Sequence, residues 1–178
     1  MSEYTLITSK LRFQIEEGIL IFLLLLSLTG IGITDYALTD GYVYWLIMVF
    51  IFALSAMFIA WLQCKQRSGE NLKKILRDES LHWGASMLIV GAAFLIQNSG
   101  RLDTASAGIL ISLILALSTI LDGIRVGWRF SMVGFYLGTS AVLASYFQHS
   151  IWVELLVAVI VIIFTILLEI FLARREPL

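Results

Sequence analysis

The sequence predicts an all-α polytopic membrane protein, with six transmembrane helices arranged as three hairpins. Three observations predict this class. First, 60% of the 178 residues are apolar and the mean hydropathy is +0.93, whereas soluble domains are about 45–50% apolar. Second, the charged residues, 14% of the chain, gather between long apolar runs. Third, these runs have the roughly 17–25 residues that a helix needs to cross a bilayer.

The apolar runs define the order of the elements within one bundle that covers the whole chain. Glu16 and Glu17 directly precede the first run, and no clear cleavage site follows it, so we expect a retained helix rather than a signal peptide. Trp45 marks a membrane–water boundary at the start of the second run. Residues 63–80 are polar and should form a cytoplasmic connector. The predicted spans are residues 18–34, 43–62, 81–97, 104–121, 130–147 and 151–173.

The basic residues predict the orientation of the bundle. Six spans place both termini on one side, and every lysine and arginine except Arg101 then falls on that side. Loops rich in lysine and arginine stay in the cytoplasm when they are short. We therefore expect a multi-pass protein of the inner (plasma) membrane with both termini cytoplasmic. The residues assigned to the inside are Lys10, Arg12, Lys65, Arg67, Lys73, Lys74, Arg77, Arg125, Arg129, Arg174 and Arg175.

Small residues predict which spans pack at the centre. Helices in lipid associate through close backbone approach and polar contacts, because lipid is as apolar as leucine. The fourth and fifth spans carry small residues at helical spacing, including Gly108 and the GxxxG pair Gly134 and Gly138. We expect these two spans to form a central hairpin. Gly84 and Gly91 on the third span, and Ala56 and Ala60 on the second span, would extend this core. The sixth span is almost entirely bulky aliphatic and should be peripheral.

One polar set stands out near the turn between the fourth and fifth spans. Asp122 and Arg125 have the spacing of a helical ion pair, provided that the fourth span continues for one more turn, and Arg129 follows them. A functional interpretation is a cytoplasmic gate or a proton-linked pair. The structural interpretation, a supporting ion pair and a basic stop signal, is favoured because charge costs least at span ends. A narrow pore would be lined by the polar side chains within the spans, Ser112, Thr119, Ser131 and Thr139.

Several chemistries are disfavoured by the composition. The net charge of −1 gives no general attraction to nucleic acid. With one cysteine, an intrachain disulfide is impossible. The two histidines, His82 and His149, should lie about 30 Å apart at opposite membrane faces, too far to share a metal or haem. No G-x-S-x-G motif is present. We therefore expect no catalytic, cofactor or metal site.

These observations lead to a functional expectation. The chain should be a non-enzymatic assembly or accessory subunit whose partners are the lipid bilayer and either further copies of itself or another membrane protein. The alternative is a small channel or transporter for an ion or a small neutral solute. Broken helices with polar groups at mid-membrane, typical of many carriers, are not evident in the sequence, where the only proline is Pro177.

Overall fold

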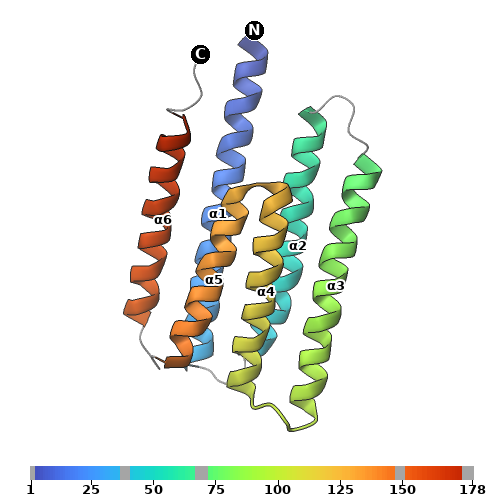
Figure 1. Ribbon diagram of the computed structural model, residues 1–178, viewed down its shortest axis with the longest axis vertical. Helices are drawn as coiled ribbons and strands as arrows, with labels where there is room; N and C mark the ends of the chain where they lie inside the picture. The colour runs from blue at the N-terminus through green and yellow to red at the C-terminus, as the bar shows by residue number, and fades with distance from the viewer. Residues whose placement is uncertain (1–2, 37–40, 67–71, 147–150, 174–178) are drawn as a thin grey trace.

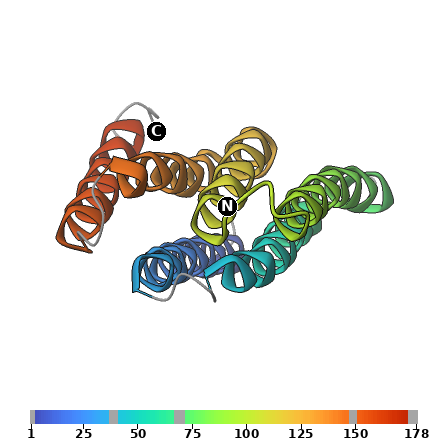
Figure 2. The ribbon, with the colours of Figure 1, turned by 90° about the horizontal axis from the view of Figure 1, so that it is seen from below.

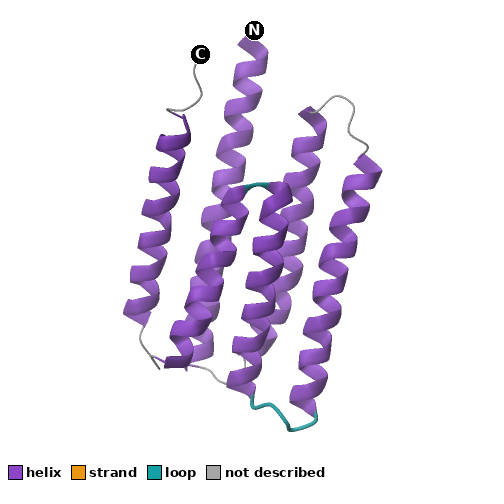
Figure 3. Ribbon diagram, in the orientation of Figure 1, coloured by secondary structure: helices purple, strands orange, loops and turns teal. Residues whose placement is uncertain are grey.

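The computed structural model describes residues 3–36, 41–66, 72–146 and 151–173. This part of the chain is entirely helices and short turns, with no strand (Figure 3). The prediction of an all-α fold is confirmed. The helices are α1 (Glu3–Tyr36), α2 (Gly41–Gln66), α3 (Leu72–Asn98), α4 (Thr104–Val126), α5 (Trp128–Tyr146) and α6 (Ile151–Ala173).

Three of these helices are long and apolar enough to cross a membrane. The qualifying segments are Val43–Gln63 in α2, Leu72–Asn98 in α3 and Thr104–Val126 in α4. A shorter apolar segment, Leu155–Leu168, lies in α6. Helices of this length and composition indicate a membrane protein, as the composition of the chain predicts.

Helices α1 to α4 extend beyond the apolar runs that predicted them. Residues 72–80, expected in a polar connector, form the first turns of α3, and α4 continues past residue 121 to Val126. The prediction ends these spans where the charged residues begin. Charged side chains do not end a helix, however, and proline, the strongest helix breaker, is absent from both regions. Both extensions matter because they carry the charged residues of the candidate site.

The helices form two layers. Seen along the bundle, α3, α4, α5 and α6 follow one another in one layer, and α1 and α2 pack beside them (Figure 2). Consecutive helices alternate in direction, so α1 begins and α6 ends at the same end of the bundle (Figure 1). The turn between α4 and α5 lies at this end too, but deeper than the ends of α1, α2 and α3 (Figure 1).

The closest helix pair is α4 and α5, at the centre. A Cβ atom on Gly134 would lie 2.7 Å from the backbone nitrogen of Ile120 and 2.8 Å from the carbonyl oxygen of Ala116, so only glycine fits there. Gly138 is less constrained, since its Cβ would lie 3.6 Å from that of Ala116. Gly108 is also buried. The small residues of α4 and α5 therefore allow backbone contact, as helix association in lipid requires.

The outer helices differ from this centre. Large apolar side chains of α6 are exposed along most of its length, among them Leu156, Ile163 and Phe171. On α3, Gly84 and Gly91 do not extend the core as predicted, because a Cβ atom on either would meet nothing within 4 Å. Glycine permits close approach of a neighbour but does not determine whether that neighbour belongs to the same chain.

Candidate functional site at one end of the bundle

Four side chains from α3 and α4 form a charged cluster near the α4–α5 turn, which we call the acidic cluster: Glu79, Trp83, Asp122 and Arg125. The Arg125 guanidinium group pairs with Glu79 Oε1 through Nη2, and the same nitrogen lies 3.3 Å from Asp122 Oδ1. The indole nitrogen of Trp83 donates a hydrogen bond of 3.1 Å to Asp122 Oδ2. Each carboxyl group is thereby bonded to a side chain of the other helix.

The acids of the cluster are buried, whereas its base is not. Asp122 is 0% exposed and Glu79 is 3% exposed, but the Arg125 side chain is 40% exposed. Removing a carboxylate from water is costly unless a positive charge and hydrogen bonds compensate it. The single guanidinium group of Arg125 therefore serves both buried carboxyl groups.

Helix geometry brings these residues together. Because α4 continues to Val126, Asp122 and Arg125 lie one turn apart on the same face. The predicted pairing of these two residues depends on this extra turn. The partner that sequence reasoning missed is Glu79. It begins the buried stripe of α3, whose members are Glu79, Trp83, Ser86, Val90 and Ala93. The spacing of three and four residues is typical of one helix face. It would predict that Glu79 is buried, provided that the helix begins before residue 81.

Two further polar contacts, made by His82 and Ser86 of α3, join α3 to α4. His82 Nε2 lies 3.0 Å from the carbonyl oxygen of Ser118. The hydroxyl groups of Ser86 and Ser118 are 2.7 Å apart. Since helices in lipid are joined by polar contacts as well as by packing, these bonds hold Glu79 and Asp122 in register. His82 thus has a positioning role at the helix interface.

Side chains of α1 and α2 also contact the ends of α4 and α5 next to the acidic cluster. Gln63 Nε2 donates a 2.5 Å hydrogen bond to the carbonyl oxygen of Val126, the last residue of α4. A helix end leaves such carbonyl groups without a partner in the helix itself, so this side chain acts as a cap from α2. Arg129 of α5 lies 3.7 Å from Glu16 of α1. Arg129 is therefore near the predicted pair in sequence but has a different acidic partner.

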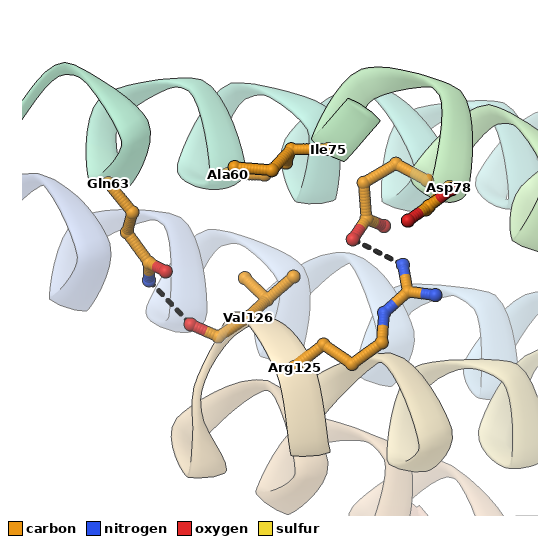
Figure 4. A pocket seen from close by; sticks show the side chains of 7 residues that line it. Ala60, Gln63, Ile75, Asp78, Arg125 and Val126 are labelled. Atoms are coloured by element: carbon orange, nitrogen blue, oxygen red, sulfur yellow. Dashed lines mark hydrogen bonds and ion pairs between the residues drawn. The ribbon is translucent and has the colours of Figure 1, made fainter. Parts of the chain in front are cut away.

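A pocket of about 230 Å³ opens beside the acidic cluster (Figure 4). Arg125 reaches across it from α4, and Gln63 lies at its other side on α2 (Figure 4). Glu79 Oε2 is buried and has no hydrogen-bond partner among the described residues. The pocket therefore lies beside a pair of buried acidic side chains. Its lining residues are Ala60, Gln63, Ile75, Asp78, Glu79, Arg125 and Val126.

The predicted pore residues lie elsewhere and are not brought to one surface. The hydroxyl groups of Ser112 and Thr119 donate to carbonyl oxygens of their own helix, at 2.8 Å and 2.6 Å. Ser131 donates across the central interface to the carbonyl oxygen of Ile120, at 3.1 Å. These three are buried, but Thr139 is exposed on α5. The hydroxyl groups of Ser112 and Thr119 are thus satisfied within α4, and that of Ser131 joins α5 to α4.

The described residues contain no group of three or more His, Cys, Asp or Glu side chains able to hold a metal ion. His149 and the side chains of Glu154 and Glu169 lie outside the described part of the chain. Comparison of the chain with protein-family models, curated proteins and solved structures finds no match.

Proposed function

We propose that this chain is a non-enzymatic, multi-pass subunit of the inner membrane that assembles through α3 with a second copy of itself. In this proposal all six helices cross the bilayer as three hairpins, and both termini are cytoplasmic. The alternating helix directions and the even number of helices support this topology (Figure 1). The excess of lysine and arginine at one end supports the orientation.

The observation that carries the assembly proposal is an exposed heptad pattern on α3, which we call the α3 seam: Leu81, Ala85, Leu88, Ala92 and Leu95. Its members alternate in spacings of four and three residues, and all five are exposed. Leu88, at the middle, is 77% exposed. Gly84 and Gly91 flank the seam with open space around them.

This pattern suits a helix partner better than lipid alone. A leucine gains little from leaving lipid for a helix surface, so association depends on close packing. Alanine and glycine beside the leucines allow two backbones to approach, and the 3.5-residue repeat keeps both helices in contact along a left-handed crossing. By contrast, α6 exposes bulky side chains such as Leu156 and Ile163 around much of its circumference, as suits a lipid-facing helix.

Cysteine cross-linking in native membranes tests the proposal. In a Cys64→Ser background, Leu88→Cys should form a disulfide-linked dimer on mild oxidation, because equivalent seam positions face each other across a two-fold axis. Ile89→Cys is the matched control. Ile89 is also exposed, at 56%, but it is turned about 100° around the helix. Equal cross-linking of both variants, or of neither, would contradict pairing through the seam.

A further inference from the structure

We propose that Glu79 and Asp122 share one proton, and that this proton makes the contact between α3 and α4 a pH-sensitive latch. Loss of the proton would leave two negative charges facing each other and would loosen this end of α3. Because α3 ends its layer and packs against α2 and α4, its contact with α4 helps to hold it in the bundle (Figure 2). The latch goes beyond the assembly proposal and does not depend on it, since it lies on the buried stripe of α3 and not on the α3 seam.

The first argument is the contact between the two carboxyl groups. The side chains of Glu79 and Asp122 hydrogen-bond to each other, and one nitrogen of Arg125, Nη2, reaches an oxygen of each. An ionised carboxylate only accepts hydrogen bonds, whereas a protonated carboxyl group donates one through its O–H. A hydrogen bond between two carboxyl groups therefore requires a proton on one of them, as in other closely paired acids.

The second argument is the balance of charge in a buried region. Asp122 is completely buried and Glu79 nearly so, and among the described residues both form their ion pairs with Arg125. One carboxylate, one neutral carboxyl group and one guanidinium group add up to zero charge. A second carboxylate would be a buried charge without compensation, which is strongly unfavourable.

The other charged groups near the pair have partners of their own. On α3, the Asp78 carboxylate pairs with Arg77, and both side chains reach solvent. On α5, Arg129 pairs with Glu16 of α1. His82 Nε2 lies 3.0 Å from a carbonyl oxygen of α4. The proton is therefore assigned to the two carboxyl groups that share Arg125.

The surroundings of the pair suit a sensor better than a proton pathway. At the cluster end, Glu79 and Arg125 line the pocket of about 230 Å³, together with the uncharged Gln63 of α2 (Figure 4). Towards the other end, the buried stripe of α3 continues with the apolar Val90 and Ala93. A proton relay across a membrane uses a chain of ionisable side chains. The pair would thus respond to the pH at the cluster end.

Chemical denaturation of the purified full-length protein in detergent, repeated from about pH 7 to about pH 10, tests the latch. In the unfolded chain both carboxyl groups are ionised over this range, so folding takes up one proton. The free energy of unfolding falls with rising pH wherever the folded state binds more protons than the unfolded state. For one proton, the equilibrium constant for folding should fall about tenfold per pH unit, until the folded protein releases the proton.

Glu79→Gln leaves one carboxylate for one guanidinium group, so its folding should take up no proton here. We expect this variant to lose the tenfold dependence per pH unit that the wild type shows. Asp78→Asn is the matched control, because it removes the neighbouring acid, which is paired at the surface, and it should keep the wild-type dependence. If Glu79→Gln does not fold, Asp122→Asn removes the same shared proton and should lose the dependence in the same way.

Infrared spectroscopy of the folded wild type supplies a second measurement that needs no variant. The carbonyl stretch of a protonated carboxyl group should be present at about pH 7 and should disappear where the folding constant stops falling, because the proton is then released. Absence of this band would overturn the proposal. So would an equal pH dependence of folding in the wild type and in folded Glu79→Gln or Asp122→Asn, or loss of that dependence in Asp78→Asn.

Discussion

The two ends of α4 each carry an aspartate, and the two carboxylates have different roles. At the start, Asp103 is exposed and bonds within its own turn, accepting from the backbone nitrogen of Ser106 at 2.7 Å and from its hydroxyl group at 2.8 Å. Near the other end, Asp122 is completely buried, and its partners Trp83 and Arg125 lie on α3 and α4. One acid caps a helix, and the other joins two helices.

This difference follows from how far each carboxylate is exposed to water. An exposed carboxylate is solvated, so its cap contributes to one helix end and to little else. A buried carboxylate depends on fixed partners, because removing a partner leaves a charge in a region of low dielectric. We therefore expect substitutions near the acidic cluster to affect the whole bundle, and substitutions in the α3–α4 turn to act locally.

The largest effect is expected from paired glycine substitutions at the two ends. A Cβ atom on Gly123 would overlap the backbone and hydroxyl group of Ser131, and backbone cannot move aside as a flexible side chain can. Gly123→Ala should therefore lower the free energy of unfolding by about 3 kcal/mol, at the upper end of overpacking costs. Chemical denaturation in detergent, followed by circular dichroism, would measure the loss.

Gly100→Ala is the matched control in the turn at the other end. Gly100 has a left-handed φ of 73° but open space around its Cβ position, so alanine should cost only about 1–2 kcal/mol of backbone strain. If Gly123→Ala lowers the free energy of unfolding no more than Gly100→Ala does, α4 and α5 are not in close contact at the cluster end.

A smaller, pH-dependent effect is expected at Asp103. Hydrogen bonds from the backbone and then the hydroxyl group of Ser106 lower the pKa of this carboxyl below its ordinary value of 3.8. A carboxyl whose pKa is depressed in the folded state stabilises it above the unfolded pKa, and this stabilisation is lost as the pH falls through the folded pKa. The melting temperature of the wild type should therefore exceed that of Asp103→Asn at neutral pH.

The two melting temperatures should converge as the pH is lowered below about 4, where the wild-type carboxyl becomes protonated. Asparagine is itself a good helix cap, so the variant isolates the charge from the cap. A melting-temperature difference that grows on acidification would show that the charge of Asp103 does not stabilise the folded state.

The contrast between the two ends also shows how far the sequence could predict the structure. The helical class follows from local patterns, and so does the one-turn spacing of Asp122 and Arg125. The partnership of Arg125 with Glu79 depends on how α3 lies against α4, which no local pattern determines. Glu79 lies in the predicted connector, because the predicted third span begins only after the charged residues. A charged residue inside a buried stripe instead indicates a paired ion within the bundle.

The small residues illustrate the same limit. Gly134 and Gly91 both have the spacing of packing residues, but only Gly134 is in close contact within the chain. The sequence predicts where a helix can approach another closely. It does not distinguish an internal neighbour from a second copy, because the same physical contact serves both.

The most direct test of the account is whether the two ends of the bundle lie on opposite sides of a membrane. Lys74 lies near the cluster end of α3, and Ser99 lies in the turn at the other end; both are exposed. In a Cys64→Ser background, a membrane-impermeant maleimide should label Ser99→Cys on intact cells. It should label Lys74→Cys only after the membrane is permeabilised. Labelling of both variants on intact cells, or the reverse order, would contradict the orientation and the membrane-spanning bundle on which the account rests.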